Sequence, residues 1–302
     1  MLRRLAYATA LVLLIGVFIF SLSRAKGDPR ELFLSEGVYV TEEQYESWGR
    51  EMGLDRPLPV QFLTWAWNAA RGDFGDSLVE KSSAWSAIRK RLPNTVQLAG
   101  VSLVWAISIG VPLGILSAVS RGSVWDIIGR TFALFGQALP VFWVGIMLVI
   151  VFAVALGWLP TSQKGGPSHL ILPSIALGWA ASASTLRLVR SSMLEVLDSA
   201  YVTYARAKGV PRIRVVWKHA FRNSMIAPLT HFGLLMVTFM SGTVVVESVF
   251  AWPGMGRLAI TSVYNNDFPV LSALTILYTL MYVGANLAVD VLYAVIDPRI
   301  RY

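Results

Sequence analysis

Few residues of this sequence have the types and spacings from which enzyme and metal sites are built. The three histidines, His169, His219 and His231, lack the i,i+4 spacing of a helical zinc pair. Cysteine is absent, which excludes thiolate ligands, a cysteine nucleophile and a disulfide framework. The chain has no Gly-Lys dipeptide and no G-x-S-x-G segment, so it lacks the phosphate loop of an ATPase and the nucleophile elbow of a hydrolase. The sequence therefore predicts no catalytic residue, no metal site and no cofactor.

Three acidic residues in or beside apolar stretches are the sharper test for chemistry inside a membrane. They are Glu247, Asp267 and Asp290. A charged side chain at the centre of a bilayer costs at least ~2.5 kcal/mol and commonly has a function. Glu247 and Asp290 fall at the ends of apolar stretches, so we expect both to reach water and Asp290 to pair with a basic neighbour. Such residues bring a proton-coupled secondary transporter, an ion channel and a membrane-embedded enzyme into consideration.

The composition shows which elements must position these residues. Of the 302 residues, 55% are hydrophobic and 15% charged, whereas an ordinary soluble domain has about a quarter charged residues. So few polar residues cannot cover a soluble surface, which excludes an ordinary soluble enzyme, a disordered chain and a basic nucleic-acid-binding domain. A bilayer core about 30 Å thick takes roughly 20 apolar residues in a helix, and the predicted fold is an all-α integral membrane protein with six transmembrane helices. The predicted spans are Leu5–Leu22, Thr95–Val119, a segment within Phe132–Leu156, Leu170–Leu186, Pro228–Val246 and Leu271–Val289.

The long polar stretch before the second span divides the chain into three predicted parts. Residues 1–22 form an N-terminal transmembrane helix, and residues 23–93 form an extracytoplasmic segment. Residues 94–302 form a five-helix core with a cytoplasmic loop at 187–227. The N-terminal basic residues would also suit a cleaved signal peptide, but an apolar stretch of about 18 residues is long for one. We therefore expect an uncleaved first span.

The net charge of +8 takes its meaning from how Lys and Arg are divided between the two sides of the membrane. With the N-terminus inside, the cytoplasmic segments hold fourteen basic and five acidic residues, and the outer segments hold twelve basic and thirteen acidic residues. In membrane proteins the excess of Lys and Arg lies in short cytoplasmic loops. We therefore expect a multi-pass protein with both termini in the cytoplasm, with membrane lipid and no nucleic acid as a partner.

Proline and glycine residues inside the spans predict local features of the helices. Pro112 and Pro140 should kink or break their helices. Gly110 and Gly114 form a small-xxx-small pair that permits the close approach of a second helix. Both features are common in helical membrane proteins, so packing is the expected role of these residues.

The loop between the fourth and fifth spans, Ser191–Pro228, is long, and we call it the elbow. Apolar residues recur at three- and four-residue steps on both sides of a break at Gly209–Pro211, which is the pattern of amphipathic helices. Gly209 can end a helix in the left-handed conformation, and Pro211 suits the first turn of the next. The sequence thus predicts two short helices that meet at a kink. The elbow suits a soluble partner that grips it, or an anionic lipid surface. Its basic rim consists of Arg206, Lys208, Arg212 and Arg214.

Several stretches of the chain together match one family. Those in the elbow are Tyr201–Val202, Ala205–Gly209 and His219–Asn223. Those elsewhere are Gly27–Pro29, Gly53–Pro57, Gly72–Ser77, Arg91–Thr95, Glu247–Gly256 and Asp297–Arg301. With these residues the chain resembles the permeases of bacterial binding-protein-dependent ABC importers, whose cytoplasmic coupling loop is called the EAA loop. More narrowly, it is similar to the B-type permeases of the dipeptide, oligopeptide and nickel branch.

The resemblance implies a fold of the type I ABC importer permease, in the bacterial inner membrane, and a set of partners. These are a second, related permease, two ATPase subunits that hydrolyse ATP, and an extracytoplasmic substrate-binding protein. The ATPase-coupling residues that it implies are Tyr201, Ala205, Arg206, Ala207, Lys208 and Gly209. A further hypothesis concerns the segment after the fifth span, which either forms a gate or contacts the binding protein, or is a simple outer turn. The residues of this hypothesis are Glu247, Trp252, Pro253 and Gly254.

The sequence departs from the family pattern in the elbow and in one outer loop, and in the elbow the later I-x-L-P of the pattern is replaced by His219, Phe221 and Arg222. The general EAA pattern would put its Glu at Thr203 and its first Ala at Tyr204, and only Ala205 and Gly209 fit. The outer loop of residues 157–169 is shorter than in some relatives. Because this loop faces the binding protein in the family, the departure bears on the substrate. Di- and oligopeptides are expected, with nickel chelates or glutathione-like compounds as alternatives.

Overall fold

The computed structural model describes residues 2–25, 41–51 and 53–296. The regular structure of these residues is helical, and Asp76 and Ser83 form an isolated antiparallel bridge. The all-α prediction is confirmed for this part of the chain. The chain divides into two compact units. The first consists of Met1–Pro93 with Leu258–Val283, and the second of Asn94–Arg257 with Gly284–Tyr302.

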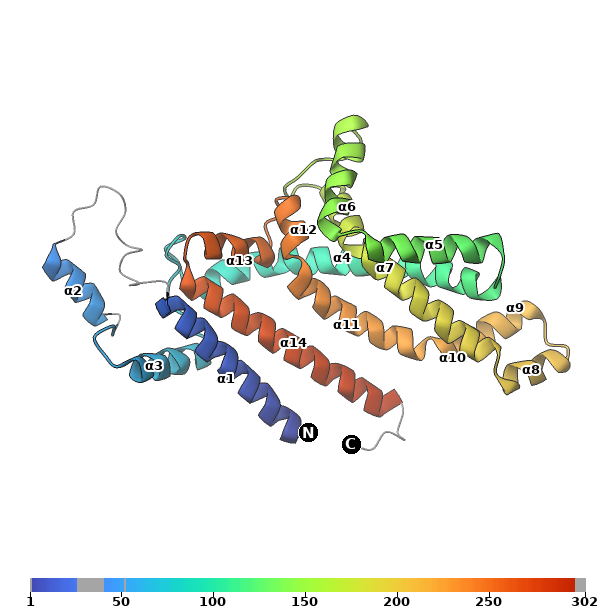
Figure 1. Cartoon of the computed structure of the whole chain (residues 1–302), viewed down its shortest axis with the longest axis horizontal. Helices are drawn as coiled ribbons and strands as arrows, with labels where there is room; N and C mark the ends of the chain where they lie inside the picture. The colour runs from blue at the N-terminus through green and yellow to red at the C-terminus, as the bar shows by residue number, and fades with distance from the viewer. Residues whose placement is uncertain (1, 26–40, 52, 297–302) are drawn as a thin grey trace. The chain divides into compact units, whose positions relative to one another are not determined.

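The first unit is built around the N-terminal helix and a shorter helix packed on it (Figure 1). Its helices are α1 (Leu2–Ala25), α2 (Glu42–Glu51), α3 (Leu58–Ala70) and most of α13 (Met255–Tyr264) and α14 (Phe268–Ile296). The Phe20 ring of α1 lies 5.5 Å from Phe62 and 6.0 Å from Trp65 of α3, measured between ring centroids. Asp267, directly before α14, accepts a hydrogen bond of 2.5 Å from Ser77 Oγ. Aromatic contacts and this buried polar pair thus hold the unit.

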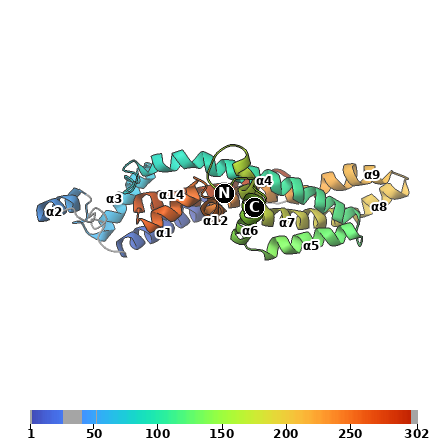
Figure 2. The same cartoon turned by 90° about the horizontal axis from the view of Figure 1, so that it is seen from above.

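The second unit is built around α7, a helix of 30 residues. Its helices are most of α4 (Ala84–Val119), α5 (Val124–Ala138), α6 (Val141–Leu148), the π-helical η2 (Val149–Ala155), α7 (Ser168–Leu197), α8 (Ala200–Ala207), α9 (Arg212–Arg214), the π-helical η3 (Val215–Phe221), α10 (Arg222–Ser224), α11 (Ile226–Gly242) and α12 (Val244–Val249). Helices α5, α6 and α11 all pack against α7, and α5 runs beside α7 in both views (Figures 1 and 2). A single long helix therefore connects the packed core of this unit to the elbow.

The helices of the described residues agree with most of the predicted spans. Three of them are long and apolar enough to cross a membrane, and two bent pairs bring the number to five if each pair is one span. The three are Ala84–Val119, Ser168–Leu197 and Phe268–Leu287, and the pairs are Val124–Ala138 with Val141–Ala155 and Arg212–Ser224 with Ile226–Met240. The first predicted span lies in α1, where Thr9–Ala25 is a shorter apolar helix. The count of six spans and the extracytoplasmic place of residues 23–93 stay predictions.

Close packing of α4 on α7 depends on two glycines, as predicted. A Cβ atom on Gly110 would lie 2.7 Å from the Ser182 carbonyl oxygen, and one on Gly114 would lie 2.8 Å from Val189 Cβ. Such distances are too short for carbon atoms in a packed interior. The two helices can therefore approach this closely only because both positions lack a side chain.

The two prolines of the predicted kinks behave differently. α5 and α6 meet at Pro140 with a bend of 104°, and Leu139 has the extended conformation that a following proline favours. α4 continues without a break through Pro112, so the break allowed for there is wrong. The contacts of Gly110 and Gly114 with α7 hold α4 on both sides of Pro112. This packing outweighs the one backbone hydrogen bond that a proline removes from a helix.

Two apolar clusters form the interior of the second unit. The larger one joins α4, α7, α11 and α12 and includes Leu98, Leu172, Phe232, Phe239, Phe250 and Trp252. The smaller one, which we call the elbow cluster, joins the ends of α4 and α7 to the elbow. It consists of Ile115, Ala118, Val189, Met193, Leu197, Val202, Val215, Val216 and Ala220.

Candidate functional site

The elbow consists of the end of α7 followed by two helical segments. α7 continues past the predicted fourth span to Leu197, and α8 begins only after a break at Asp198 and Ser199. The helical segment Arg212–Ser224, formed by α9, η3 and α10, follows the second break. A single helix before Gly209 was expected from the apolar pattern, and that expectation is wrong. Ser199 takes the extended conformation typical of an N-cap residue, and this separates α8 from α7.

The predicted kink at Gly209 is confirmed. Gly209 has a φ of +75°, which is left-handed. Its N–H donates to the Arg206 carbonyl at 2.9 Å, and the Val210 N–H donates to the Ala205 carbonyl at 3.2 Å. These two bonds form the Schellman arrangement, in which a glycine just past the helix satisfies the last carbonyl groups. Pro211 directly precedes the next helical segment, so the turn is defined on both sides.

One buried side chain and several exposed hydrogen bonds hold the parts of the elbow together and attach it to the rest of the second unit. Val202 is fully buried in the elbow cluster. The Tyr201 hydroxyl donates to the His219 carbonyl at 3.2 Å and accepts a hydrogen bond of 3.0 Å from Asn223 Nδ2. Arg212 Nη2 donates to the Val119 carbonyl at the end of α4 at 2.8 Å. The elbow is therefore attached to both α4 and α7 and cannot move independently of them.

The other face of the elbow is exposed and combines apolar and basic side chains. Tyr204, Ile213 and Trp217 are each more than half exposed. Lys208 Nζ lies 4.6 Å from the centroid of the Tyr204 ring, in a cation–π contact. Of the residues implied to couple to the ATPase, Ala205 is half-buried and the others are exposed. An exposed aromatic patch on a firmly attached element is the usual form of a protein-docking surface.

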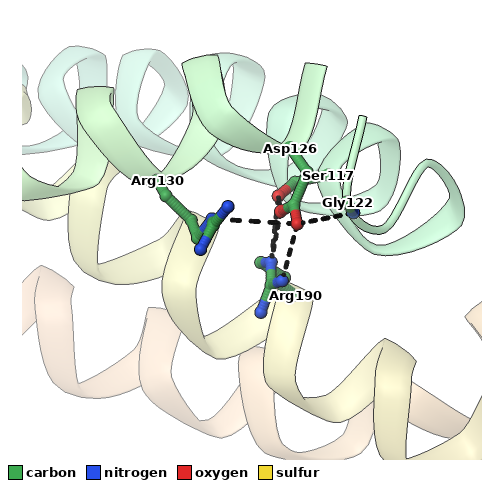
Figure 3. A network of polar contacts seen from close by, with 5 residues as sticks. All are labelled: Ser117, Gly122, Asp126, Arg130 and Arg190. Carbon is green, nitrogen blue, oxygen red and sulfur yellow. Dashed lines mark hydrogen bonds and ion pairs between the residues drawn. The ribbon is translucent and has the colours of Figure 1, made fainter. Parts of the chain in front are cut away.

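A buried ion pair holds the start of α5 against α7 beside the elbow (Figure 3). Asp126 is 2% exposed, and its two oxygens accept hydrogen bonds from Arg190 Nε at 2.8 Å and Nη2 at 3.0 Å. Ser117 Oγ donates to Oδ1 at 2.5 Å, and the Gly122 N–H donates to Oδ2 at 3.1 Å. Arg130 Nε lies 3.7 Å from Oδ2. Donors from α4, the following turn, α5 and α7 thus compensate the buried charge.

The sequence reasoning missed this ion pair. In the sequence, Asp126 was counted only as one of the five acidic residues of the predicted cytoplasmic segments. A signal was present, because an acidic residue on the first turn of an apolar helix needs a partner when that helix is packed. Its partner Arg190 lies 64 residues away, so the pairing follows from the packing of α5 on α7 and not from spacing.

Glu247 directly follows the fifth predicted span and lies in α12. Its carboxylate is hydrogen-bonded to the start of α13. Its carboxylate accepts hydrogen bonds from Thr95 Oγ1 at 2.7 Å and from the Arg257 N–H at 2.9 Å. Arg257 is in the first turn of α13, and the N-terminus of a helix stabilises a negative charge. The side chain is fully buried, so the expectation that Glu247 reaches water is wrong. The reason is the turn above it, where a Cβ atom on Gly254 would collide with the carboxylate.

The outer turn, residues 250–254, is fixed by hydrogen bonds to Asn94. The Trp252 side chain is 1% exposed, and its Nε1 donates to the Asn94 carbonyl at 3.0 Å. Asn94 Nδ2 donates to the Pro253 carbonyl at 2.7 Å, and Asn94 Oδ1 accepts a hydrogen bond of 2.6 Å from Lys164 Nζ. In this conformation the indole of Trp252 belongs to the apolar interior, and a partner protein could touch only the backbone and edges of the turn.

The other residues singled out in the sequence lie apart from these two places, except His219, which lies in the elbow. Asp267 is buried with Ser77 in the first unit. His169, His219 and His231 lie on α7, η3 and α11. Asp290 lies on α14, with its side chain outside the described residues, as are the matching stretches Gly27–Pro29 and Asp297–Arg301.

The described residues form a helical fold with several apolar helices long enough to cross a membrane and an exposed elbow, as expected for a transporter permease. Two family descriptions match the chain. "Binding-protein-dependent transport system inner membrane component" matches residues 110–302, and "Binding-prot-dependent transport system membrane comp, N-term" matches residues 1–99. The chain belongs to this family of ABC importer permeases, as the resemblance implied.

Known relatives match the chain over almost its whole length. The oligopeptide transport system permease protein AppB of Bacillus subtilis is 41% identical over 308 residues, which cover 96% of each chain. The glutathione transport system permease protein GsiC of Escherichia coli K12 is 41% identical over 294 residues, 97% of this chain and 95% of the relative. Among solved structures, an inward-facing MetNI methionine ABC transporter has a TM-score of 0.55 at 19% identity and covers 69% of this chain and 97% of that chain. The last of these likenesses concerns the fold alone.

Proposed function

We propose that this chain is one of two related permease subunits in an ATP-driven importer, and that its elbow docks into an ATPase subunit. The exposed aromatic and basic face of the elbow, attached through Val202 and the Tyr201 hydrogen bonds, carries this proposal. ATP is bound and hydrolysed by two separate ATPase subunits, and a binding protein delivers substrate from outside. Both termini and the elbow lie in the cytoplasm, in agreement with the excess of basic residues in those segments.

The mechanism is a mechanical coupling between the elbow and the spans. Closure of the ATPase subunits displaces α8, and the elbow cluster passes the displacement to the ends of α4 and α7. Because α7 is one helix of 30 residues, a movement at Leu197 tilts the whole helix. ATP and the loaded binding protein then favour the outward-open state of a two-state equilibrium. Such a permease needs a path and a rigid connection, and it needs no catalytic residue.

The proposed substrates are di- and oligopeptides. The relatives named as oligopeptide and glutathione permeases support this class, since glutathione is itself a tripeptide. Nickel chelates and glutathione-like compounds are the alternatives within the same architecture, and the relative named as a glutathione permease fits the second of these. On the outer side, the turn of residues 250–254 is the proposed gate or binding-protein contact, where Glu247 links it to the start of α13.

Cross-linking tests the docking proposal directly because the chain contains no cysteine. Ala207→Cys, on the exposed face of the elbow, should cross-link to the ATPase subunit in the assembled complex. Thr161→Cys, which is exposed on the predicted outer loop, is the matched control and should not. In intact cells a membrane-impermeant maleimide should label the Thr161→Cys variant and leave the Ala207→Cys variant unlabelled. Labelling of Ala207→Cys from outside, or no cross-link to the ATPase, would overturn the proposal.

Uptake in vesicles tests the substrate. With the binding protein and ATP present, peptides should accumulate, and uptake should stop when hydrolysis is blocked. Uptake driven by a proton gradient without ATP would instead support a secondary transporter. A nickel chelate that competes with peptides for the binding protein would support the alternative substrate.

A further inference from the structure

Helix α3 of the first unit exposes large apolar side chains and carries no charge, unlike a helix on a soluble surface. Its thirteen residues contain no charged side chain, and none of them is buried. Leu63 is 66% and Trp67 60% exposed, and Leu58 and Val60 are exposed too. A helix in water places its apolar stripe against the protein and its polar residues outside. In α3 large apolar side chains are exposed as well.

The polar residues of α3 point instead toward its own unit. Gln61, Thr64 and Asn68 line a cavity of about 700 Å³. Gln61 Nε2 donates to the Leu54 and Arg56 carbonyl groups at 3.1 and 2.7 Å. The spacing of three and four residues puts these side chains on one face of the helix. Of these three residues only Gln61 is half-buried, and Thr64 and Asn68 are exposed at the edge of the cavity. Leu63 and Trp67 are exposed on the adjoining part of the helix surface.

The contacts of α3 with α1 place it at the depth of the membrane. Phe62 and Trp65 pack on Phe20 of α1, and a Cβ atom on Gly16 would lie 3.4 Å from the Trp65 ring. Gly16 precedes Leu22, the outer end of the first apolar stretch, by six residues. At 1.5 Å per residue this is about 9 Å along a helix. Interfacial helices bury their apolar faces about 5–10 Å into the boundary between headgroups and acyl chains.

Arginines stand at both ends of this uncharged helix. Arg56 precedes α3 and Arg71 follows it, and both are exposed. The Arg71 guanidinium lies 4.5 Å from the centroid of the Trp67 ring. Tryptophan is enriched at the membrane interface, and the long stem of an arginine lets its charged end reach the headgroup region. The ends of α3 thus suit phosphate groups and its middle suits acyl chains.

We propose that α3 is an interfacial helix that lies in the outer leaflet of the membrane against α1. Val60, Leu63 and Trp67 face acyl chains, and Arg56 and Arg71 bind lipid phosphates. The segment of residues 23–93 is therefore membrane-bound at α3. The helix fixes the outer end of α1 and the cavity beside it at the level of the lipid headgroups.

Spin labels at single cysteines test this depth. The complete transporter, with the labelled permease, is reconstituted in vesicles of phosphatidylethanolamine and phosphatidylglycerol. Collision rates of the label are measured with oxygen, which concentrates in the bilayer, and with a water-soluble nickel chelate. Leu14→Cys in α1 is the lipid reference, and Glu43→Cys in α2 is the water reference. Thr64→Cys, next to Leu63 but on the cavity face of α3, is the matched control.

The labels at Leu63→Cys and Trp67→Cys should favour oxygen over the nickel chelate, as the label at Leu14→Cys does. The label at Thr64→Cys should show a clear shift toward the chelate. A preference for the chelate at both apolar positions, equal to that at Glu43→Cys, would overturn the proposal. So would a loss of oxygen contact at Leu63→Cys when the binding protein is added, because the face would then be a protein-docking surface. Depth is measured without transport, so the result is independent of whether the elbow docks into an ATPase.

Discussion

The ion pair between Asp126 and Arg190 should make one of the largest single contributions to the stability of the second unit. Asp126→Asn keeps the shape of the side chain and removes its charge. Arg190, whose side chain is 22% exposed, then stays in place with its charge uncompensated. The asparagine can still accept the hydrogen bond from Ser117 Oγ or from the Gly122 N–H.

The expected cost is about 3 kcal/mol, at the lower end of the range for removing one partner of a buried pair. The chain offers a matched control in the exposed pair of Arg121 and Asp198, which lies 3.4 Å apart with side chains 65% and 67% exposed. Exposed pairs contribute about 0–1 kcal/mol because water screens them. Asp198→Asn should therefore leave the free energy of unfolding almost unchanged.

The measurement is the free energy of unfolding of the purified permease in mixed micelles, titrated with a denaturing detergent. A double-mutant cycle with Arg190→Gln isolates the pair from the other contacts of each residue, and its coupling energy should fall in the upper half of about 0.5–3 kcal/mol. Equal, small effects of Asp126→Asn and Asp198→Asn would refute the reasoning. A coupling energy near zero would assign the role of Asp126 to Ser117 and Gly122 instead.

Three further substitutions test the elbow and the outer turn. Gly209→Pro should abolish ATP-driven uptake while the amount of protein in the membrane stays normal, since proline forbids the positive φ and removes the N–H bonded to Arg206. The control Gly209→Ala should lower the free energy of unfolding by only about 1–2 kcal/mol, because of left-handed strain. Normal uptake by the proline variant would contradict a coupling role of the elbow. Gly254→Ala should lower uptake because its Cβ collides with Glu247. Gly166→Ala in the outer loop, which has open space around it, should leave uptake unchanged. Equal uptake by the two variants would be evidence against a tight turn. Trp252→Ala removes a buried side chain at a cost of about 3–5 kcal/mol, and unchanged uptake would argue against a gate at this turn.

Features that depend on neighbours in the sequence could be predicted from it. The apolar stretches, the bend at Pro140 and the left-handed turn at Gly209 all follow from the conformational limits of single residues and from the length of a helix. The close approach of α4 to α7 was also predictable, because two glycines one helical turn apart leave a flat surface. Pro112 shows the limit of this reasoning, since packing on α7 keeps α4 continuous where local chemistry favours a break.

Features that depend on which helices pack together could not be predicted in the same way. Glu247 was expected in water because it ends an apolar stretch, but the chain folds back and places the start of α13 over it. Asp126 needs Arg190, and only the packing of α5 on α7 brings these residues together. The same holds for α3, whose missing charges were visible in the sequence, while its contact with Gly16 and Phe20 was not.

Asp126 and Glu247, the two buried carboxylates among the described residues of the second unit, are compensated in different ways, and the difference fits the parts of the chain that they join. Asp126 faces the full charge of Arg190, which fixes α5 to the long helix that carries the elbow. Glu247 faces neutral donors, Thr95 Oγ1 and the N–H of Arg257 at the start of α13. A pair of full charges in a protein interior is strongly destabilised when its members separate, whereas donors at a helix N-terminus are satisfied by water at small cost. The junction at α5 and α7 therefore suits a rigid connection, and the turn above Glu247 suits a part that opens and closes.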